Sequence, residues 1–287
     1  MTNKASFIRL FVNVVIVFLL LSGVLVMFYP TVVNYIYSSK TQNIITQFQA
    51  SADNLTKESD GNTLEQMRED MAAYNKELYM NGQGGLQDPF SFETTAFDLS
   101  QYGIENNIAG YVTIPRMDIE LPIYLGATYE NLALGASSLG YTSVPVGGEN
   151  SNTVLAAHRG YQGESMFRDI ESLEIGDMVY VTNFWETLVY EVSEIRIILP
   201  TEIQEVYIQP GKDLLTLVTC HPYTKNYQRY IVFCERTEYK ESETKQQAAA
   251  NLKEMSSSQR LIFIEKWLPR AFFIVGLVFL LIVKRKR

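Results

Sequence analysis

The chain has 287 residues, of which 47% are hydrophobic and 20% charged, enough for one sizeable domain or two small ones with a filled core. Six of its 24 basic residues lie in two end segments that contain no acidic residue; between them, 18 basic residues stand against 32 acidic ones, a formal charge of −14. Because phosphate binding needs basic patches, a middle this acidic argues against a nucleic-acid-binding protein.

The first apolar segment, residues 10–29, is 20 residues long and uncharged, about the length that crosses a bilayer. Lys4 and Arg9 precede it, as basic residues precede a cleavable signal peptide. However, the apolar stretch is longer than a usual signal core, and no small-x-small cleavage pattern follows it. We therefore predict a retained transmembrane helix over residues 10–29, preceded by a cytoplasmic N-terminus over residues 1–9.

Between the apolar segments, residues 30–80 have apolar positions at helical spacing, so we expect one or two extracellular helices. The spacing is interrupted at Asp60-Gly61 and ends at Gly82. Residues 81–103, which follow, are rich in glycine and turn-forming residues. A loop this long within a compact protein is usually functional or disordered.

From residue 104 to residue 240 the pattern changes to short β-branched and aromatic segments, separated by Gly, Pro, Asn and Asp. Seven of these segments predict strands: 109–115, 119–126, 152–158, 178–183, 188–198, 213–220 and 229–236. Residues 128–138 and 164–173 are expected to form short helices. Seven or eight strands at such intervals predict a mainly β fold, a closed or nearly closed β-barrel.

After a connecting segment, residues 241–266, a second apolar segment spans residues 267–283 and precedes the basic tail of residues 284–287. It approaches spanning length if Trp267 lies at the interface and Arg270 extends its charge into the headgroups. A buried C-terminal helix is the alternative. Because basic residues flank the outer ends of both segments, we expect both termini in the cytoplasm and the chain between them outside. This predicts a two-pass protein of the cell membrane, in contact with membrane lipid.

Both cysteines lie in the last two predicted strands. If these strands pair, Cys220 lies opposite Arg229, and directly opposed residues point to the same face. The next residue, His221, points away and is poorly placed to activate the thiol. In the same register Cys234 lies opposite Leu215, about 17 Å along the strand from Cys220, whereas bridged cysteines need α-carbons within about 7 Å. We therefore predict an unpaired thiol at Cys220 and a buried small hydrophobic residue at Cys234.

His158 is the candidate partner of Cys220. A cysteine nucleophile needs a base or an ion-pair partner that is near in space rather than in sequence. The chain has 2 histidines, and because His221 is excluded by geometry, His158 remains. Taken singly, His158 fits a surface or satisfied core residue, and Arg229 fits a surface ion pair. Their combination with Cys220 is what indicates a catalytic site.

These residues form a recognisable pattern. The segment "TLVTC" ends in Cys220, Arg229 follows nine residues later, and "AAHRG" with His158 lies upstream. In this order the motifs resemble the sortase family of membrane-bound cysteine transpeptidases, over residues 109–236. The resemblance implies an eight-stranded sortase β-barrel over residues 104–240. It also implies Cys220 as nucleophile, His158 as acid/base and Arg229 as stabiliser.

Three further features resemble class C, the pilin-polymerising sortases: two membrane segments, the stretch "YPTVVNYIYS" after the first, and an Asp-Pro-aromatic sequence before the barrel. Here that sequence is Asp88, Pro89 and Phe90, within the loop of residues 81–103. The resemblance implies that the loop is a lid over the catalytic site, although Asp-Pro alone often starts an ordinary turn. One departure is His221, where pilin-type members commonly have a small polar residue; we assign no chemistry to it.

The resemblance also implies the reaction. Cys220 would cleave the Thr-Gly bond of an LPXTG-like sorting signal, through a thioester, and a lysine amine of the next pilin would resolve it to an isopeptide bond. Such a protein would assemble pili on the wall of Gram-positive bacteria. No metal cluster or phosphate-binding loop is apparent, so we expect no cofactor and no metal. Two alternatives stay open: a sortase that anchors surface proteins to peptidoglycan, and a non-catalytic membrane scaffold.

Overall fold

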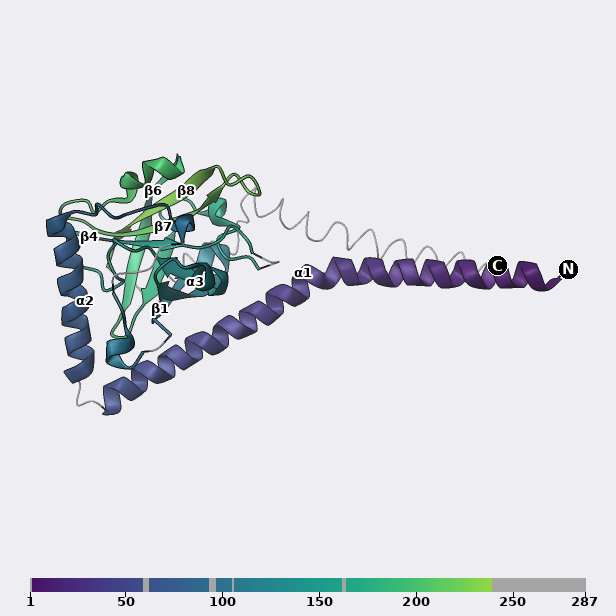
Figure 1. Cartoon of the computed structure of the whole chain (residues 1–287), viewed down its shortest axis with the longest axis horizontal. Coiled ribbons are helices and arrows are strands. Elements are labelled where there is room, and N and C mark those ends of the chain that lie inside the picture. Colours follow the sequence, from purple (N-terminus) through teal and green to yellow (C-terminus); the bar gives the residue numbers. More distant parts are fainter. Residues whose placement is uncertain (1, 59–61, 93–96, 105, 162–163, 239–287) are drawn as a thin grey trace. The chain divides into compact units, whose positions relative to one another are not determined.

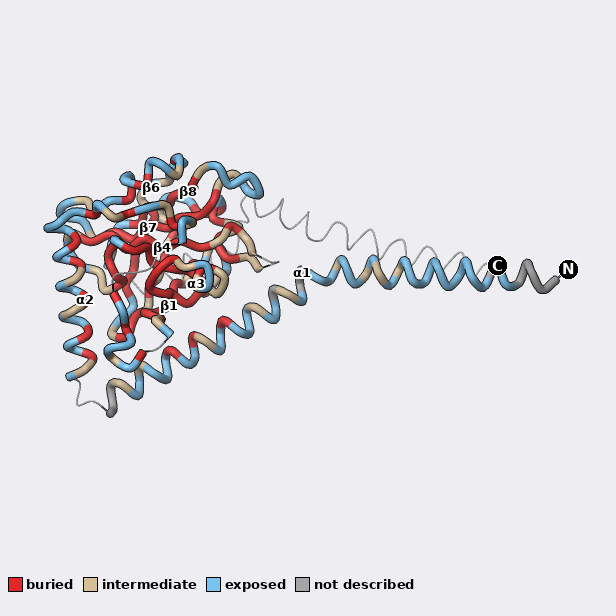
Figure 2. Tube along the Cα trace, in the orientation of Figure 1, coloured by how far each residue is buried: buried red, intermediate tan, exposed pale blue. Residues whose placement is uncertain are grey.

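The computed structural model describes residues 2–58, 62–92, 97–104, 106–161 and 164–238. The chain divides at Tyr37/Ser38 into two compact units. Helix α1 (Thr2–Glu58) begins in the first unit. Its residues 10–29, with a mean hydropathy of 2.9, are long and apolar enough to cross a membrane, and they are almost entirely exposed (Figure 2). The second predicted membrane segment, residues 267–283, lies outside the described residues, as do residues 241–266 and 284–287.

The second unit contains a closed barrel of eight strands, in the order β1-β2-β3-β4-β7-β8-β6-β5 (Figure 1). The strands are β1 (Ile108–Ile114), β2 (Ile119–Leu125), β3 (Ala136–Ser138), β4 (Ser151–Ala156), β5 (Met178–Thr182), β6 (Thr187–Ile198), β7 (Asp213–His221) and β8 (Gln228–Arg236). The predicted closed β-barrel is therefore confirmed. In the closed barrel, every strand has a neighbouring strand on both sides.

Strand β7, which ends in Cys220 and His221, lies between β4 and β8 in the barrel. It pairs in parallel with β4, with Ala156 opposite Val218, and antiparallel with β8. Residues 214–220 are all buried, in keeping with the nearly continuous apolar run of the segment. Because both of its neighbours belong to the same sheet, the end of β7 is held between the ends of β4 and β8.

The expected helix over residues 128–138 is only partly right. Helix α3 (Tyr129–Leu134) begins after Thr128, whose hydroxyl accepts the Asn131 N–H, but the chain then continues as the short strand β3. This strand pairs in parallel with β2 and antiparallel with β4. Its three small residues carry no β-branched or aromatic signal. Barrel closure, rather than local preference, makes them a strand.

The expected helix over residues 164–173 is also wrong for most of its length. Only Ile170–Ser172 form a helical turn, the 3-10 turn η4. The chain before it is held by backbone bonds between Tyr161 and Glu164 and between Phe167 and the carbonyl of His158. This loop therefore folds back onto the end of β4 instead of continuing as a helix.

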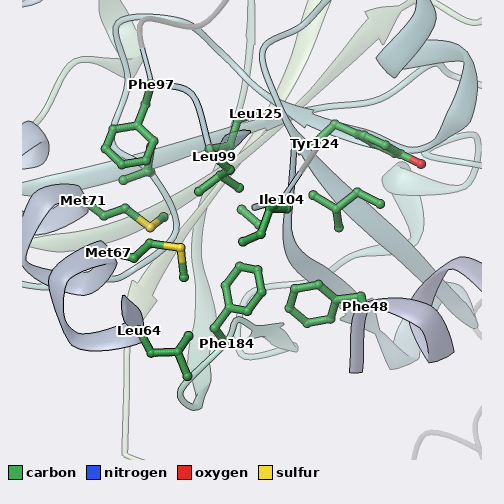
Figure 3. Close-up of a cluster of buried hydrophobic side chains, with 13 residues drawn as sticks. Phe48, Leu64, Met67, Met71, Phe97, Leu99, Ile104, Tyr124, Leu125 and Phe184 are labelled. Carbon is green, nitrogen blue, oxygen red and sulfur yellow. The ribbon is translucent and has the colours of Figure 1, made fainter. Parts of the chain in front are cut away.

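Helix α2 (Asn62–Asn81) and the end of α1 cover one part of the barrel surface. Met67 and Met71, one turn apart on α2, are fully buried in one cluster with Phe48 of α1 and with Phe184 between β5 and β6 (Figure 3). The amide of Asn75 donates to the carbonyl of Val144 at 3.1 Å and accepts its N–H at 2.8 Å. These contacts fix the point from which the loop of residues 81–103 begins.

Candidate active site

Cys220 and Arg229 face each other at the ends of β7 and β8. They are directly paired in the register, which confirms the pairing predicted from the sequence. Cys220 is 8% exposed and Arg229 is 6% exposed. Nη1 of Arg229 also donates to the backbone carbonyls of Asn226 and Gln228, at 3.0 and 2.8 Å, so the connection between the strands orients the guanidinium.

Cys234 lies opposite Leu215, also as predicted. Both cysteines are free thiols, and Cys234 is completely buried. A disulfide between the two is therefore excluded, and Cys220 alone lies beside a charged residue of the opposing strand.

The neighbouring parallel strand brings His158 to the same edge of the barrel. The Ala157 N–H donates to the Val218 carbonyl at 3.2 Å, and the Thr219 hydroxyl donates to the Ala157 carbonyl at 2.7 Å. Because β4 and β7 run in the same direction, the next residues, His158 and Cys220, leave the two strands side by side. The sequence could nominate His158 only by elimination; the parallel pairing supplies the position.

Two aromatic rings enclose the imidazole of His158. Tyr161 stacks on it, with ring centroids 4.7 Å apart and planes 12° apart, and Phe90 lies on another side at 5.6 Å. Its Nε2 is buried without a hydrogen-bond partner among the described residues. Burial lowers the pKa of His158, which favours the neutral ring at neutral pH.

The Asp88-Pro89-Phe90 sequence folds locally into a short turn. The Asp88 carboxylate accepts the Phe90 N–H at 3.2 Å and caps the 3-10 turn η1 (Pro89–Ser91), with Pro89 buried at its first position. The Ser91 hydroxyl closes the turn by donating to the Asp88 carbonyl at 2.7 Å.

The same turn also contacts Arg229 and His158, the charged group and the imidazole ring beside Cys220. Asp88 pairs with Arg229 through two parallel bonds, Nε to Oδ1 at 2.5 Å and Nη2 to Oδ2 at 2.7 Å. The Arg229 guanidinium carbon lies 5.0 Å from the centre of the Phe90 ring. Phe90 thus contacts both Arg229 and His158, the two residues that flank the thiol.

The surroundings of Cys220 keep it protonated in this arrangement. Burial raises the pKa of the Cys220 thiol to about 11; Arg229 and Arg159 lower it, whereas Asp88 raises it. At neutral pH the thiol and the imidazole are therefore both neutral. Removal of Asp88 would leave the charge of Arg229 unopposed beside the sulfur and would free two of its donors.

Sequence reasoning missed three residues around this site: Arg159, Tyr161 and Glu171. Arg159 and Tyr161 follow His158 within "AAHRGY", so their closeness along the chain was the available signal. Glu171, on η4, had none. Among the described residues, no group of three or more His, Cys, Asp or Glu side chains could hold a metal ion.

Comparison with known proteins agrees with this geometry. A family model described as "Sortase domain" matches residues 112–237. The crystal structure of Sortase C from Streptococcus pneumoniae superposes with a TM-score of 0.61 and 32% identity, over 69% of this chain and 97% of that one. The chain belongs to the sortase family.

Other sortases support the assignment and its class. Sortase C from Clostridium perfringens SM101 gives a TM-score of 0.56 at 32% identity, over 69% of this chain and 99% of that one. Among curated sortases, Sortase A of Bacillus anthracis is 32% identical over 45% of this chain and 59% of its own length. Sortase A of Streptococcus agalactiae is 34% identical over 39% and 47%. The chain thus matches less than two thirds of either curated relative, and its structural likeness is to class C sortases.

Proposed function

We propose that this sortase is a membrane-anchored cysteine transpeptidase that joins pilin subunits. The observation that carries this proposal is the bidentate pair between Asp88 and Arg229, with Phe90 against His158. An Asp-Pro-aromatic lid over the catalytic residues is the feature by which the sequence resembles class C. The printed description of the similar pneumococcal Sortase C concerns pilin substrate specificity. The substrate would be a pilin or surface protein with an LPXTG-like sorting signal.

In the acylation step, the Cys220 thiol transfers its proton to the imidazole of His158, and the resulting thiolate attacks the carbonyl carbon of the Thr-Gly peptide bond. Arg229, opposite Cys220 in the register, stabilises the developing oxyanion or holds the substrate backbone. His158 gives its proton to the leaving amine, the carbon–nitrogen bond breaks, and a thioester between the threonine carbonyl and the Cys220 sulfur is formed.

In the second step, a lysine amine of another pilin attacks the thioester. His158 accepts a proton from this amine, and the sulfur leaves as a thiolate. The product is an isopeptide bond, and return of the proton from His158 to the Cys220 sulfur restores the starting state of the enzyme. Transpeptidation requires that water compete poorly with the amine, so the aromatic rings around His158 would serve to exclude it.

The Asp88-Pro89-Phe90 turn would act as a gate that controls both substrate access and the ionisation of Cys220. With Asp88 bound to Arg229, the guanidinium has fewer donors for an oxyanion, and the Cys220 pKa of about 11 disfavours the thiolate. Departure of the turn would add water and remove the carboxylate, and both changes lower the pKa of Cys220. Substrate binding and activation of the nucleophile would then require the same movement.

The deciding experiment uses the full chain, purified in detergent, and a pilin that carries an LPXTG-like tail. Mass spectrometry would follow an acyl adduct on Cys220 and lysine isopeptide products. Cys220→Ala should abolish both, whereas the matched variant Cys234→Ala, which removes the other thiol, should retain both. Persistence of polymers in Cys220→Ala would refute the nucleophile assignment.

The same assay distinguishes the alternatives. An adduct that only water or a peptidoglycan amine resolves would indicate a sortase that anchors surface proteins to the cell wall. Absence of any adduct, with a folded protein, would indicate a non-catalytic scaffold. A Cys220 adduct together with lysine linkage supports the pilin polymerase.

A further inference from the structure

The residues that directly follow His158 and Cys220 are bonded to each other. Nη1 of Arg159 lies 2.7 Å from Nδ1 of His221 and 3.4 Å from the backbone carbonyl of Cys220. Nη2 of the same guanidinium lies 2.5 Å from the carboxylate of Glu171. One side chain thus connects the end of β4, the end of β7 and the turn η4.

The burial of this cluster shows that it is part of the barrel end rather than a surface ion pair. The Arg159 side chain is only 5% exposed and that of His221 is 16% exposed, whereas Glu171 is 49% exposed. The Tyr230 ring of β8 lies 5.9 Å from the Arg159 guanidinium carbon and 5.6 Å from the His221 ring. A buried guanidinium stays where its partners are, because unpaired burial of its charge is costly.

The chemistry of these side chains determines which atoms donate and which accept in the cluster. Arginine has only donors, so Nδ1 of His221 must accept the bond from Arg159, which places the proton of a neutral ring on Nε2. Nδ1 also lies 3.2 Å from the Glu171 carboxylate. The planar fork of arginine reaches several acceptors at once, which a lysine ammonium in its place cannot do in the same geometry.

We propose that Arg159 is a positioning residue for transpeptidation: together with Glu171 and His221 it locks the end of β7 that carries Cys220 to the end of β4 that carries His158. This inference rests on the proposed function. The lock keeps the thiol and the imidazole at a fixed separation after the Asp88-Pro89-Phe90 turn has left. A secondary effect supports it, since the charge of Arg159 lowers the pKa of Cys220, against burial and Asp88 and in the same direction as Arg229.

The test measures two quantities on the full chain in detergent. The first is the rate of Cys220 alkylation by iodoacetamide as a function of pH, which does not depend on transpeptidase activity. The second is the pair kcat and KM for transfer of an LPXTG-like peptide to an amine. In Arg159→Gln we expect alkylation at pH 8 to slow about threefold, through the lost positive charge. We expect kcat to fall about tenfold or more with KM changed by less than about twofold, because Arg159 holds the catalytic pair and not the substrate.

Three further variants and one control variant separate positioning from a general structural role. Arg159→Lys should restore the alkylation profile, because the charge returns, but not kcat, because the fork is lost. His221→Leu should lower kcat as Arg159→Gln does, and His221→Asn, which keeps an acceptor for the guanidinium, should recover most of it. Arg196→Gln is the matched control: Arg196 also contacts two carboxylates, Glu194 and Glu205, but its side chain is 41% exposed. It should leave both quantities unchanged.

The outcomes are distinct. Wild-type kcat and alkylation in Arg159→Gln would overturn the proposal, as would losses that match the unfolded fraction in all variants. If the wild-type protein forms no product, the proposed function fails. The alkylation profiles then decide whether the cluster acts on Cys220: slower alkylation in Arg159→Gln, restored in Arg159→Lys, supports that action, and identical profiles refute it.

Discussion

At the level of single residues, Asp88 has two tasks that its carboxylate performs together. It caps its own turn through the Phe90 N–H, and it neutralises Arg229 from across the site. The first contact makes the turn a stable unit, and the second places that unit against Cys220. Asp88 therefore links local turn formation to the electrostatics of the thiol.

Asp88→Ala should increase the alkylation rate of Cys220 by iodoacetamide about tenfold or more at pH 7.5. The sign follows from the charges: Asp88 raises the pKa of the thiol, so its removal lowers this pKa and increases the thiolate fraction. The measurement is the labelled fraction of the Cys220 peptide over time. Asp98→Ala, which removes another carboxylate of the same loop that caps Ser100, should have no effect. Equal rates in Asp88→Ala and wild type would show that Asp88-Pro89-Phe90 is an ordinary turn without influence on Cys220.

Phe90→Ala should act differently, because the ring carries no charge. It removes contacts with His158 and Arg229 that cover the thiol, so alkylation should accelerate by a similar factor across the whole pH range. Asp88→Ala, by contrast, should shift the pH dependence itself. Comparison of the two pH–rate profiles is the measurement. Identical profiles for Phe90→Ala and wild type would show that the ring does not limit access to Cys220.

At the level of elements, helix α2 and the loop after it are tied to the barrel by buried amides. Asn75 bonds both backbone groups of Val144. Gln83 donates to the Tyr141 carbonyl at 2.8 Å and accepts the Ile208 N–H at 2.6 Å. Since both amides lie just before Asp88 in the chain, they hold the start of the loop while its middle contacts the site.

Asn75→Ala should destabilise the protein by about 1–3 kcal/mol, because the buried Val144 N–H would lose its partner, whereas the Val144 carbonyl would keep the Thr153 hydroxyl and the Val146 N–H as donors. The neighbouring exposed residue provides the control: Lys76→Ala should change the free energy of unfolding by less than about 0.5 kcal/mol. Denaturant unfolding followed by tryptophan fluorescence is the measurement. Equal midpoints for the two variants would show that the amide does not anchor α2.

At the level of the whole molecule, the two apolar segments predict a two-pass topology. A phosphatase that is active only outside the cytoplasm should be active when fused after residue 238 and inactive when fused after residue 287. A fusion after residue 9 should also be inactive, since residues 1–9 are predicted to be cytoplasmic. Activity of the fusion after residue 287 would place the C-terminus outside and contradict the second membrane segment.

Features that depend on neighbours along the chain could be predicted from the amino-acid sequence alone. The apolar residues 10–29 are a property of composition, and the opposition of Cys220 to Arg229 follows from counting across one hairpin. The β-branched segments, separated by turn residues, indicated a barrel. The same reasoning excluded a disulfide at Cys220, because strand spacing is nearly constant.

Features that depend on barrel closure could not be predicted from the sequence, because closure sets them. Closure made residues 136–138 a strand and set β4 beside β7 in parallel, so that His158 and Cys220 lie at the same edge of the barrel. It also brought Asp88 to Arg229, 141 positions away in the chain. It also joined Arg159 to Glu171 and His221. The physical reason is that pairings between distant segments gain their free energy from packing the whole barrel, and no local pattern encodes which partner that packing selects.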